Sequence, residues 1–112
     1  MTESLASSAR LRRQWNVAVP SRILKRMRDS VRSRDYVMTL HADDEMNDDD
    51  LTVFDVESVI LTGEIIRRER DPKTKERKYV VRGQIVLGDE DAVVVTKFGP
   101  TGKLVIITVY VE

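Results

Sequence analysis

The sequence contains no cysteine, so neither a disulfide framework nor a thiolate zinc site is available to it. This lack is typical of a protein of the reducing cytoplasm, which is the location that we predict. The chain has a single histidine, His41, and therefore no second histidine to complete a transition-metal site. No apolar run approaches the roughly 18 residues of a membrane span. No phosphate-binding glycine loop or nucleophile elbow is recognisable either.

What the chain does contain is a strong separation of charge, although its formal net charge is zero. Residues 1–34 carry nine Arg or Lys and two acids, whereas residues 35–64 carry ten acids and no Arg or Lys. Residues 65–112 return to a net charge of +3. A basic segment of this kind can bind nucleic acid or an acidic protein, or it can lie against the acidic middle of its own chain.

The first half of the chain predicts helices, and its length of 112 residues predicts one domain. Residues 1–19 contain few core-forming residues, so we expect an N-terminal tail there and a folded domain over residues 20–112. A helical stripe of apolar residues runs from residue 21 to about 34. We then expect a short strand over 36–40 and a short helix over 41–48. A further helix should start at Thr52, where Thr52 and Asp55 have the spacing of a capping box, and end at Gly63.

The second half predicts strands that are joined by short turns. Successive strands with such short connections form hairpins, so we expect an antiparallel meander. The fold class is therefore α+β, with N-terminal helices packed on one face of a roughly four-stranded antiparallel sheet. The expected strands cover residues 64–70, 77–87, 92–98 and 103–111.

The acidic stretch after His41 does not have the pattern of a metal site. A calcium loop of the EF-hand type needs a glycine at position six and a glutamate at position twelve, and no frame of this stretch supplies them. His41 and Glu45 are four residues apart on one helix face, but they lack a third ligand. We therefore predict no metal and no cofactor, with the acids at helix N-termini and on the surface. His41 can move protons near neutral pH, or it can be a capping or packing residue.

The basic residues of the strands are the second group of candidates. Lys78 and Arg82 share one face by the period of two, and so do Arg68 and Arg70. Such a face, with a tyrosine nearby, could hold a phosphodiester and move a proton. The alternative is a solvated surface with edge charges that block aggregation. The candidates are Arg67, Arg68, Arg70, Lys78, Arg82, Lys97 and Tyr110.

Several short motifs together resemble the DUF4258 domain family over roughly residues 34–111. The matching elements are His41-Ala42 with Met46, Leu51-Thr52 through Asp55-Val56, Val59-Ile60, Gly63-Glu64-Ile65, Tyr79 through Gly83, and Thr101 through Tyr110. The chain departs from the family at Glu45 and Asp49, where many members carry basic residues. The resemblance implies a fold like that of the small RelE/barnase-like ribonucleases.

The same resemblance implies a function and a partner. The protein would be the bacterial toxin of a type II toxin–antitoxin pair, and its partner a zinc-finger, helix-turn-helix antitoxin. It would be a metal-independent endoribonuclease that cuts mRNA with the ribose 2′-OH as nucleophile. In that reading His41 handles a proton or orients the site, Arg82 and Lys97 hold the phosphate, and Tyr110 is a secondary catalytic candidate. Arg67, Arg68, Arg70 and Lys78 would bind the nucleic acid.

Two other functions remain open from the sequence. The chain could be a non-catalytic protein-interaction domain, whose basic helix or acidic patch docks a partner protein. It could also be a nucleic-acid-binding regulator that uses residues 10–34, with binding that falls steeply as salt rises.

Overall fold

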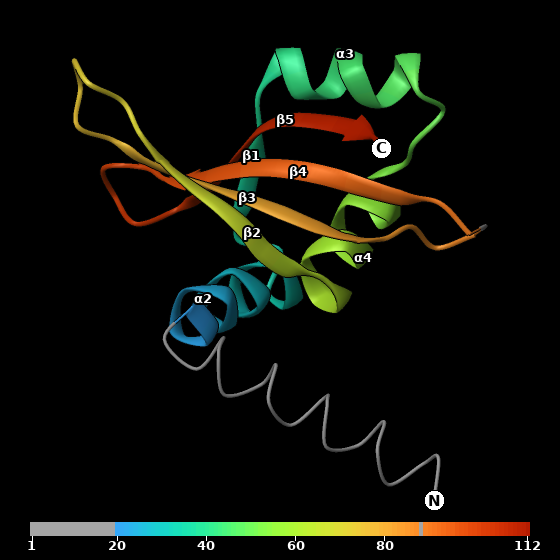
Figure 1. Cartoon of the computed structure of the whole chain (residues 1–112), viewed down its shortest axis with the longest axis horizontal. Coiled ribbons are helices and arrows are strands. Elements are labelled where there is room, and N and C mark those ends of the chain that lie inside the picture. Colours follow the sequence, from blue (N-terminus) through green and yellow to red (C-terminus); the bar gives the residue numbers. More distant parts are fainter. Residues whose placement is uncertain (1–19, 88) are drawn as a thin grey trace, which may run out of the picture.

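The structure, a computed structural model, describes residues 20–87 and 89–112. This part of the chain is an α+β domain with three helices and one five-stranded mixed sheet (Figure 1). The predicted tail, residues 1–19, lies outside the described residues. The elements are α2 (Pro20–Arg32), β1 (Tyr36–Met38), α3 (Leu40–Asp48), α4 (Val53–Thr62), β2 (Glu64–Arg70), β3 (Arg77–Gln84), β4 (Asp91–Phe98) and β5 (Leu104–Val111).

The helices form where the sequence patterns place them. Leu24, Met27 and Val31 of α2 are buried along one stripe, as predicted. Helix α4 begins at a capping box, in which the Thr52 hydroxyl accepts from the Asp55 N–H and the Asp55 carboxylate accepts from the Thr52 N–H. The helix ends at Thr62, just before the predicted glycine.

The expectation of a four-stranded, wholly antiparallel sheet is wrong. Strands β2 to β5 form the predicted meander, but β1 adds a fifth strand that pairs in parallel with β5. Tyr36 lies opposite Leu104, and Met38 lies opposite Ile106. The strand order is β1-β5-β4-β3-β2, so β5 is an interior strand. Turn residues in the sequence predict only hairpins between strands that follow one another in the chain. They do not predict the pairing of two segments that are far apart in the sequence, such as β1 and β5.

Helices α2 and α4 cover one face of the sheet. Helix α4 packs on β3 and β4, and α2 packs on α4 and reaches β2 (Figure 1). The fully buried Met27, Val59, Ile60, Val94 and Ile106 form the centre of this core. We call this side of the sheet the helix face.

The strand residues that alternate with the core positions point to the opposite side of the sheet, which we call the open face. Val80 and Val93 point to it, and both are fully buried although neither belongs to the hydrophobic core cluster. Their burial means that neighbouring side chains on this face cover them. By strand register the same face carries Arg67, Lys78, Arg82, Val95, Lys97, Thr108 and Tyr110.

Two glycines let the end of α4 approach the sheet closely. A Cβ at Gly63 would collide with the carbonyl oxygen of Arg82, and a Cβ at Gly83 would collide with that of Val59. Arg28 of α2 secures the same junction, because its Nε donates to the Ile60 carbonyl at 3.0 Å and its guanidinium donates to the Gly63 carbonyl at 2.8 Å. These carbonyls lie at the helix C-terminus, where no intrahelical donor is available.

Candidate functional site

The open face brings five of the predicted site residues onto one surface, but most of their charges are already paired. The Arg82 guanidinium lies 3.3 Å from the Asp91 carboxylate and 3.1 Å from the Glu112 carboxylate. Lys97 Nζ lies 2.8 Å from Glu76, and its side chain is only 28% exposed. These ion pairs hold the two cations at the rim of an apolar floor, which the buried Val80 and Val93 form on the open face.

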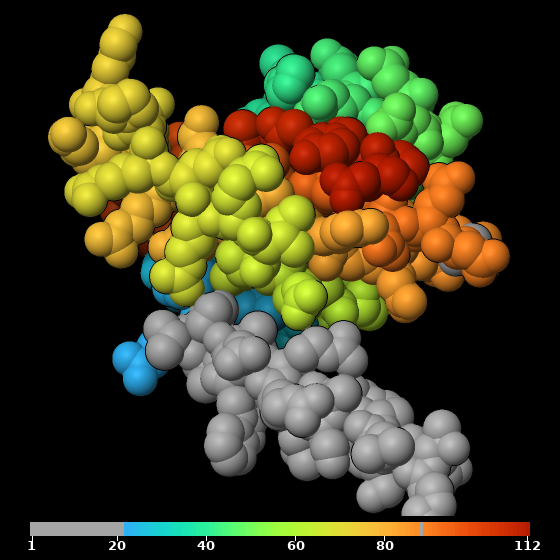
Figure 2. All heavy atoms as spheres, viewed as in Figure 1, coloured from blue at the N-terminus to red at the C-terminus, as the bar shows by residue number. Residues whose placement is uncertain are grey.

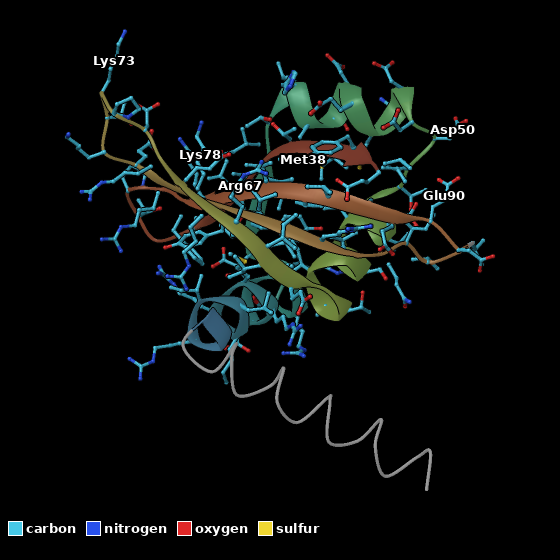
Figure 3. All side chains as sticks on the ribbon, in the orientation of Figure 1. Met38, Asp50, Arg67, Lys73, Lys78 and Glu90 are labelled. Carbon is cyan, nitrogen blue, oxygen red and sulfur yellow. The ribbon has the colours of Figure 1, made fainter. Side chains whose placement is uncertain are left out.

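Strand β2 and the middle of β3 complete this face. Arg67 Nε donates to Glu69 at 2.8 Å within the same strand. Lys78 lies opposite Glu69 in the register, and it takes part in no ion pair among residues 20–87 and 89–112. Figure 3 shows Arg67 and Lys78 close to each other on neighbouring strands. Tyr110 of β5 lies across β4 from Arg82, with Val93 between them.

The Lys97–Glu76 pair changes the acidity of its carboxylate. The hydrogen bond from Lys97 is the main cause, together with the charge of the same ammonium group, and it holds the pKa of Glu76 below its ordinary value. Glu76 is therefore an anion throughout the neutral range. It remains the partner of Lys97 unless another anion competes for the ammonium group.

His41 occupies a different place, in the first turn of α3 beyond the edge of the sheet. Its Nε2 lies 3.3 Å from the Glu45 carboxylate, and its side chain is 68% exposed. No hydrogen bond or ion pair within the described part of the chain joins it to Arg82, Lys97 or Tyr110. The structure therefore brings together three of the four predicted catalytic residues on one face, and His41 lies apart from them on another element.

The acidic stretch has a structural role that the sequence did not reveal. Strand β1 pairs with β5 only as far as Ile106, which leaves the rest of this edge of β5 without a neighbouring strand. Two carboxylates of α3 replace it: Glu45 accepts from the Val109 N–H at 3.0 Å, and Asp49 accepts from the Val111 N–H at 3.1 Å. Figure 1 shows α3 lying along β5. The helix thus covers a sheet edge with acceptors.

Asp55 is the most buried acid of the described residues, and it also has a structural role. Burial raises its pKa, but the N–H groups of Thr52 and Val86 more than offset that effect, so the pKa lies below its ordinary value. Among residues 20–87 and 89–112, no group of three or more His, Asp or Glu side chains could hold a metal ion. Glu45, Asp49 and Asp55 instead accept hydrogen bonds from backbone N–H groups.

Comparison with known proteins identifies the family. The family model described as "Domain of unknown function (DUF4258)" matches residues 38–111. The chain belongs to the DUF4258 family. No curated protein and no solved structure matches it, and the predicted likeness to the RelE/barnase-like fold stays a prediction.

The DUF4258 region contains every predicted site residue, whereas α2 precedes it. No helix in the described residues is long and apolar enough to cross a membrane.

Within the DUF4258 region, Arg68 and Arg70 lie on the helix face, on the other side of the sheet from Arg82 and Lys97. They line a hollow of about 350 Å³ with Glu69, Arg77 and Tyr79. Arg77 is not among the site residues that the sequence predicts. The period of two places it on the face of Tyr79, but only the register of the hairpin brings it opposite Arg70.

Proposed function

We propose that this DUF4258 protein is a metal-independent endoribonuclease that cuts mRNA, and that it acts as the toxin of a toxin–antitoxin pair. The observation that supports this proposal most is the open face, where Arg82, Lys97 and Tyr110 surround an apolar floor. RNA supplies its own nucleophile, so the protein has to neutralise a phosphate and move two protons. The residues of this face are of the right types for these tasks.

The reaction would proceed by transfer within the RNA. The ribose 2′-oxygen attacks the adjacent phosphorus and loses its proton, and the bond from phosphorus to the 5′-oxygen breaks as that oxygen gains a proton. The products are a 2′,3′-cyclic phosphate and a 5′-hydroxyl. Arg82 and Lys97 would hold the phosphate oxygens, Tyr110 would transfer a proton, and His41 would act from the side of α3 as an orienting or proton-handling group.

The ion pairs of the open face are compatible with this role. The Arg82 side chain is 46% exposed, and Asp91 and Glu112 are also solvent-accessible. Exposed pairs of this kind contribute little to stability, so a phosphate can replace the carboxylates at low cost. In the absence of RNA, the carboxylates keep the cations at fixed positions on the face.

The test is a cleavage assay on a 5′-labelled single-stranded RNA in the presence of a metal chelator. We expect a 2′,3′-cyclic phosphate product with the wild type. Arg82→Gln, Lys97→Gln and Tyr110→Phe should each lower kcat/KM by about 100-fold or more, because each removes a group that acts in the transition state. Lys25→Gln, an exposed residue of α2 paired with Asp29, is the matched control.

Expression in a bacterial host gives a second readout. Induction of the wild type should arrest growth with fragmentation of total RNA, and His41→Ala and Arg82→Ala should relieve both while the proteins remain folded. Normal growth with intact RNA, together with no cleavage in vitro, would refute the proposal.

A non-catalytic protein-interaction domain is the second candidate, and a separate surface favours it. A hollow of about 420 Å³ beside the start of α4 is lined by Phe54, Val86 and Leu87 together with Asp50 and Asp55. The Phe54 side chain is 59% exposed and Leu87 is 81% exposed, which is unusual for large apolar residues in one place. We propose a protein ligand with apolar side chains for it, with a zinc-finger, helix-turn-helix antitoxin as the first partner to test.

A pull-down with such an antitoxin would test that surface. Phe54→Ser and Leu87→Ser should abolish capture, and Val37→Ser, an exposed apolar residue on β1, should leave it unchanged. Capture without RNA cleavage by the wild type would favour the interaction domain over the ribonuclease.

A further inference from the structure

Three arginines gather on the helix face at the end of the β2–β3 hairpin. Arg68 and Arg70 of β2 lie opposite Tyr79 and Arg77 of β3, so two of the three guanidinium groups come from directly paired positions. Like charges that face each other across a strand pair are destabilising. We call Arg68, Arg70 and Arg77 the arginine cluster; all three are exposed, and they line the hollow of about 350 Å³. Figure 2 shows this hairpin projecting from the body of the molecule.

The acids near the cluster are engaged elsewhere. Glu69 binds Arg67 on the open face, and Glu76 binds Lys97 on the same face. The carboxylate of Asp71 accepts from two N–H groups of its own turn, those of Lys73 and Thr74, at 2.8 and 3.0 Å.

None of the ion pairs among the described residues therefore includes a member of the arginine cluster. Glu69 lines the same hollow, but no close ion pair offsets the repulsion within the cluster, and an anionic ligand would relieve it.

Aromatic rings hold the cluster and extend it toward α2. The Arg68 guanidinium lies 5.9 Å from the centre of the Tyr79 ring, and Tyr79 meets Phe98 edge to face at 6.5 Å. The Arg26 guanidinium of α2 lies 3.7 Å from the centre of the Phe98 ring, and its Nη2 donates to the Gly102 carbonyl at 3.3 Å. A guanidinium over a ring uses its flat side for that contact, so the N–H groups at its edge stay available for oxygen acceptors.

The edge strand β2 presents cations to both sides of the sheet. Arg67 points to the open face, and the next residue, Arg68, points to the helix face. A polyanion bound on the open face can therefore continue around the edge of β2 to the arginine cluster, with Arg67 and Arg68 as cations along this path. Only a flexible strand can make such a turn, because a duplex is stiff over this distance.

We propose that the arginine cluster binds backbone phosphates of single-stranded RNA that continues from the open face around β2. This inference rests on the proposed function, and it adds the class of substrate: a single strand long enough to reach both faces. The cluster holds the flanking part of the strand, and the open face holds the phosphate that is cut.

The test is RNA binding by the full-length protein, measured by fluorescence anisotropy over a range of salt. The probes are 2′-O-methyl oligonucleotides, which cannot be cleaved, of about 4 and about 16 nucleotides. The cluster variant is R68Q/R70Q/R77Q and the open-face variant is R67Q/R82Q/K97Q. The matched control, K25Q/R32Q/K103Q, removes three cations that pair with Asp29 or Asp35. Thermal unfolding followed by circular dichroism confirms that each variant is folded.

We expect the wild type to bind the long probe more tightly than the short one, and the cluster variant to lose that advantage. Three lost phosphate contacts should lower the slope of log affinity against log salt by about 2, since each contact to a single strand contributes about 0.7. The matched control should keep the slope of the wild type. The cluster variant should bind the short probe as tightly as the wild type does, which separates this site from the open face.

Other outcomes would overturn the inference in distinguishable ways. If the cluster variant kept the slope of the wild type while the open-face variant lost binding, the inference would fall and the proposed function would stand. If a duplex of the same length bound as tightly as the single strand, the path around β2 would be wrong. If the wild type bound no RNA, both proposals would fall together, whether or not the cluster captured an acidic protein.

Discussion

Removal of the Glu45 carboxylate should destabilise the domain far more than removal of its neighbour in sequence. Glu45 is the acceptor for the Val109 N–H, and Val109 is only 1% exposed, so water cannot easily replace the carboxylate. A buried donor left without a partner costs about 1–3 kcal/mol. The exposed pair with His41 adds little. We therefore expect Glu45→Ala to lower the free energy of unfolding by about 2 kcal/mol, or Tm by on the order of 10 °C.

Urea unfolding followed by circular dichroism measures this change, with Asp44→Ala as the matched control. Asp44 is an exposed acid of the same helix, so its loss should shift stability by less than about 0.5 kcal/mol. Glu45→Gln keeps an oxygen that can accept from Val109 and should lie between the two. Hydrogen exchange at the Val109 amide should accelerate in Glu45→Ala. Equal unfolding midpoints for Glu45→Ala and Asp44→Ala would refute the idea that α3 replaces a strand at this edge.

Three further changes test other contacts of the fold. Arg28→Ala should lower the free energy of unfolding by about 2–3 kcal/mol, because two charge-assisted hydrogen bonds to the end of α4 are lost; urea titration beside Lys25→Ala checks it. Gly83→Ala should cost about 1–3 kcal/mol through collision with the Val59 carbonyl, and no loss in thermal unfolding would contradict the close approach of α4. The pKa of Asp55 is lower in the folded protein than its ordinary value of 3.8, so its stabilisation is present above that pH and lost as the pH falls through it toward the folded pKa. Acid titration of stability should therefore be flatter for Asp55→Asn than for the wild type.

Local signals in the sequence predicted most of the helices and hairpins. The apolar stripe of α2 and the capping box of Thr52 and Asp55 depend on residues that are close in the chain, and the structure confirms both. The four strands of the meander follow for the same reason, because turn residues connect each to the next.

The features that the sequence did not reveal depend on contacts between distant residues. The parallel pairing of β1 with β5 joins Tyr36 to Leu104, and the contact of Glu45 with the Val109 N–H likewise spans the domain. An acid of α3 carries no local mark that distinguishes an acceptor for a strand from a solvated charge. Glu45 and Asp49 are the two acids of α3 with that role.

The candidate site divides in a way that composition could not predict. Neighbouring residues of a strand point to opposite faces, so Arg67 and Arg68 separate as soon as the strand forms. Which face each arginine points to depends on a register shift between Ile65 and Arg67. No residue pattern in the sequence predicts this shift. The basic residues of β2 therefore serve two surfaces.

The position of β5 has a consequence for the synthesis of the protein in the cell. This strand is made after all the other described elements, yet it lies inside the sheet and supplies the fully buried Leu104 and Ile106. Until it emerges, β1 has no partner, α3 has no edge to cover, and Tyr110 is missing from the open face. Contacts between distant segments also form late in folding. The open face should therefore stay incomplete until β5 has left the ribosome.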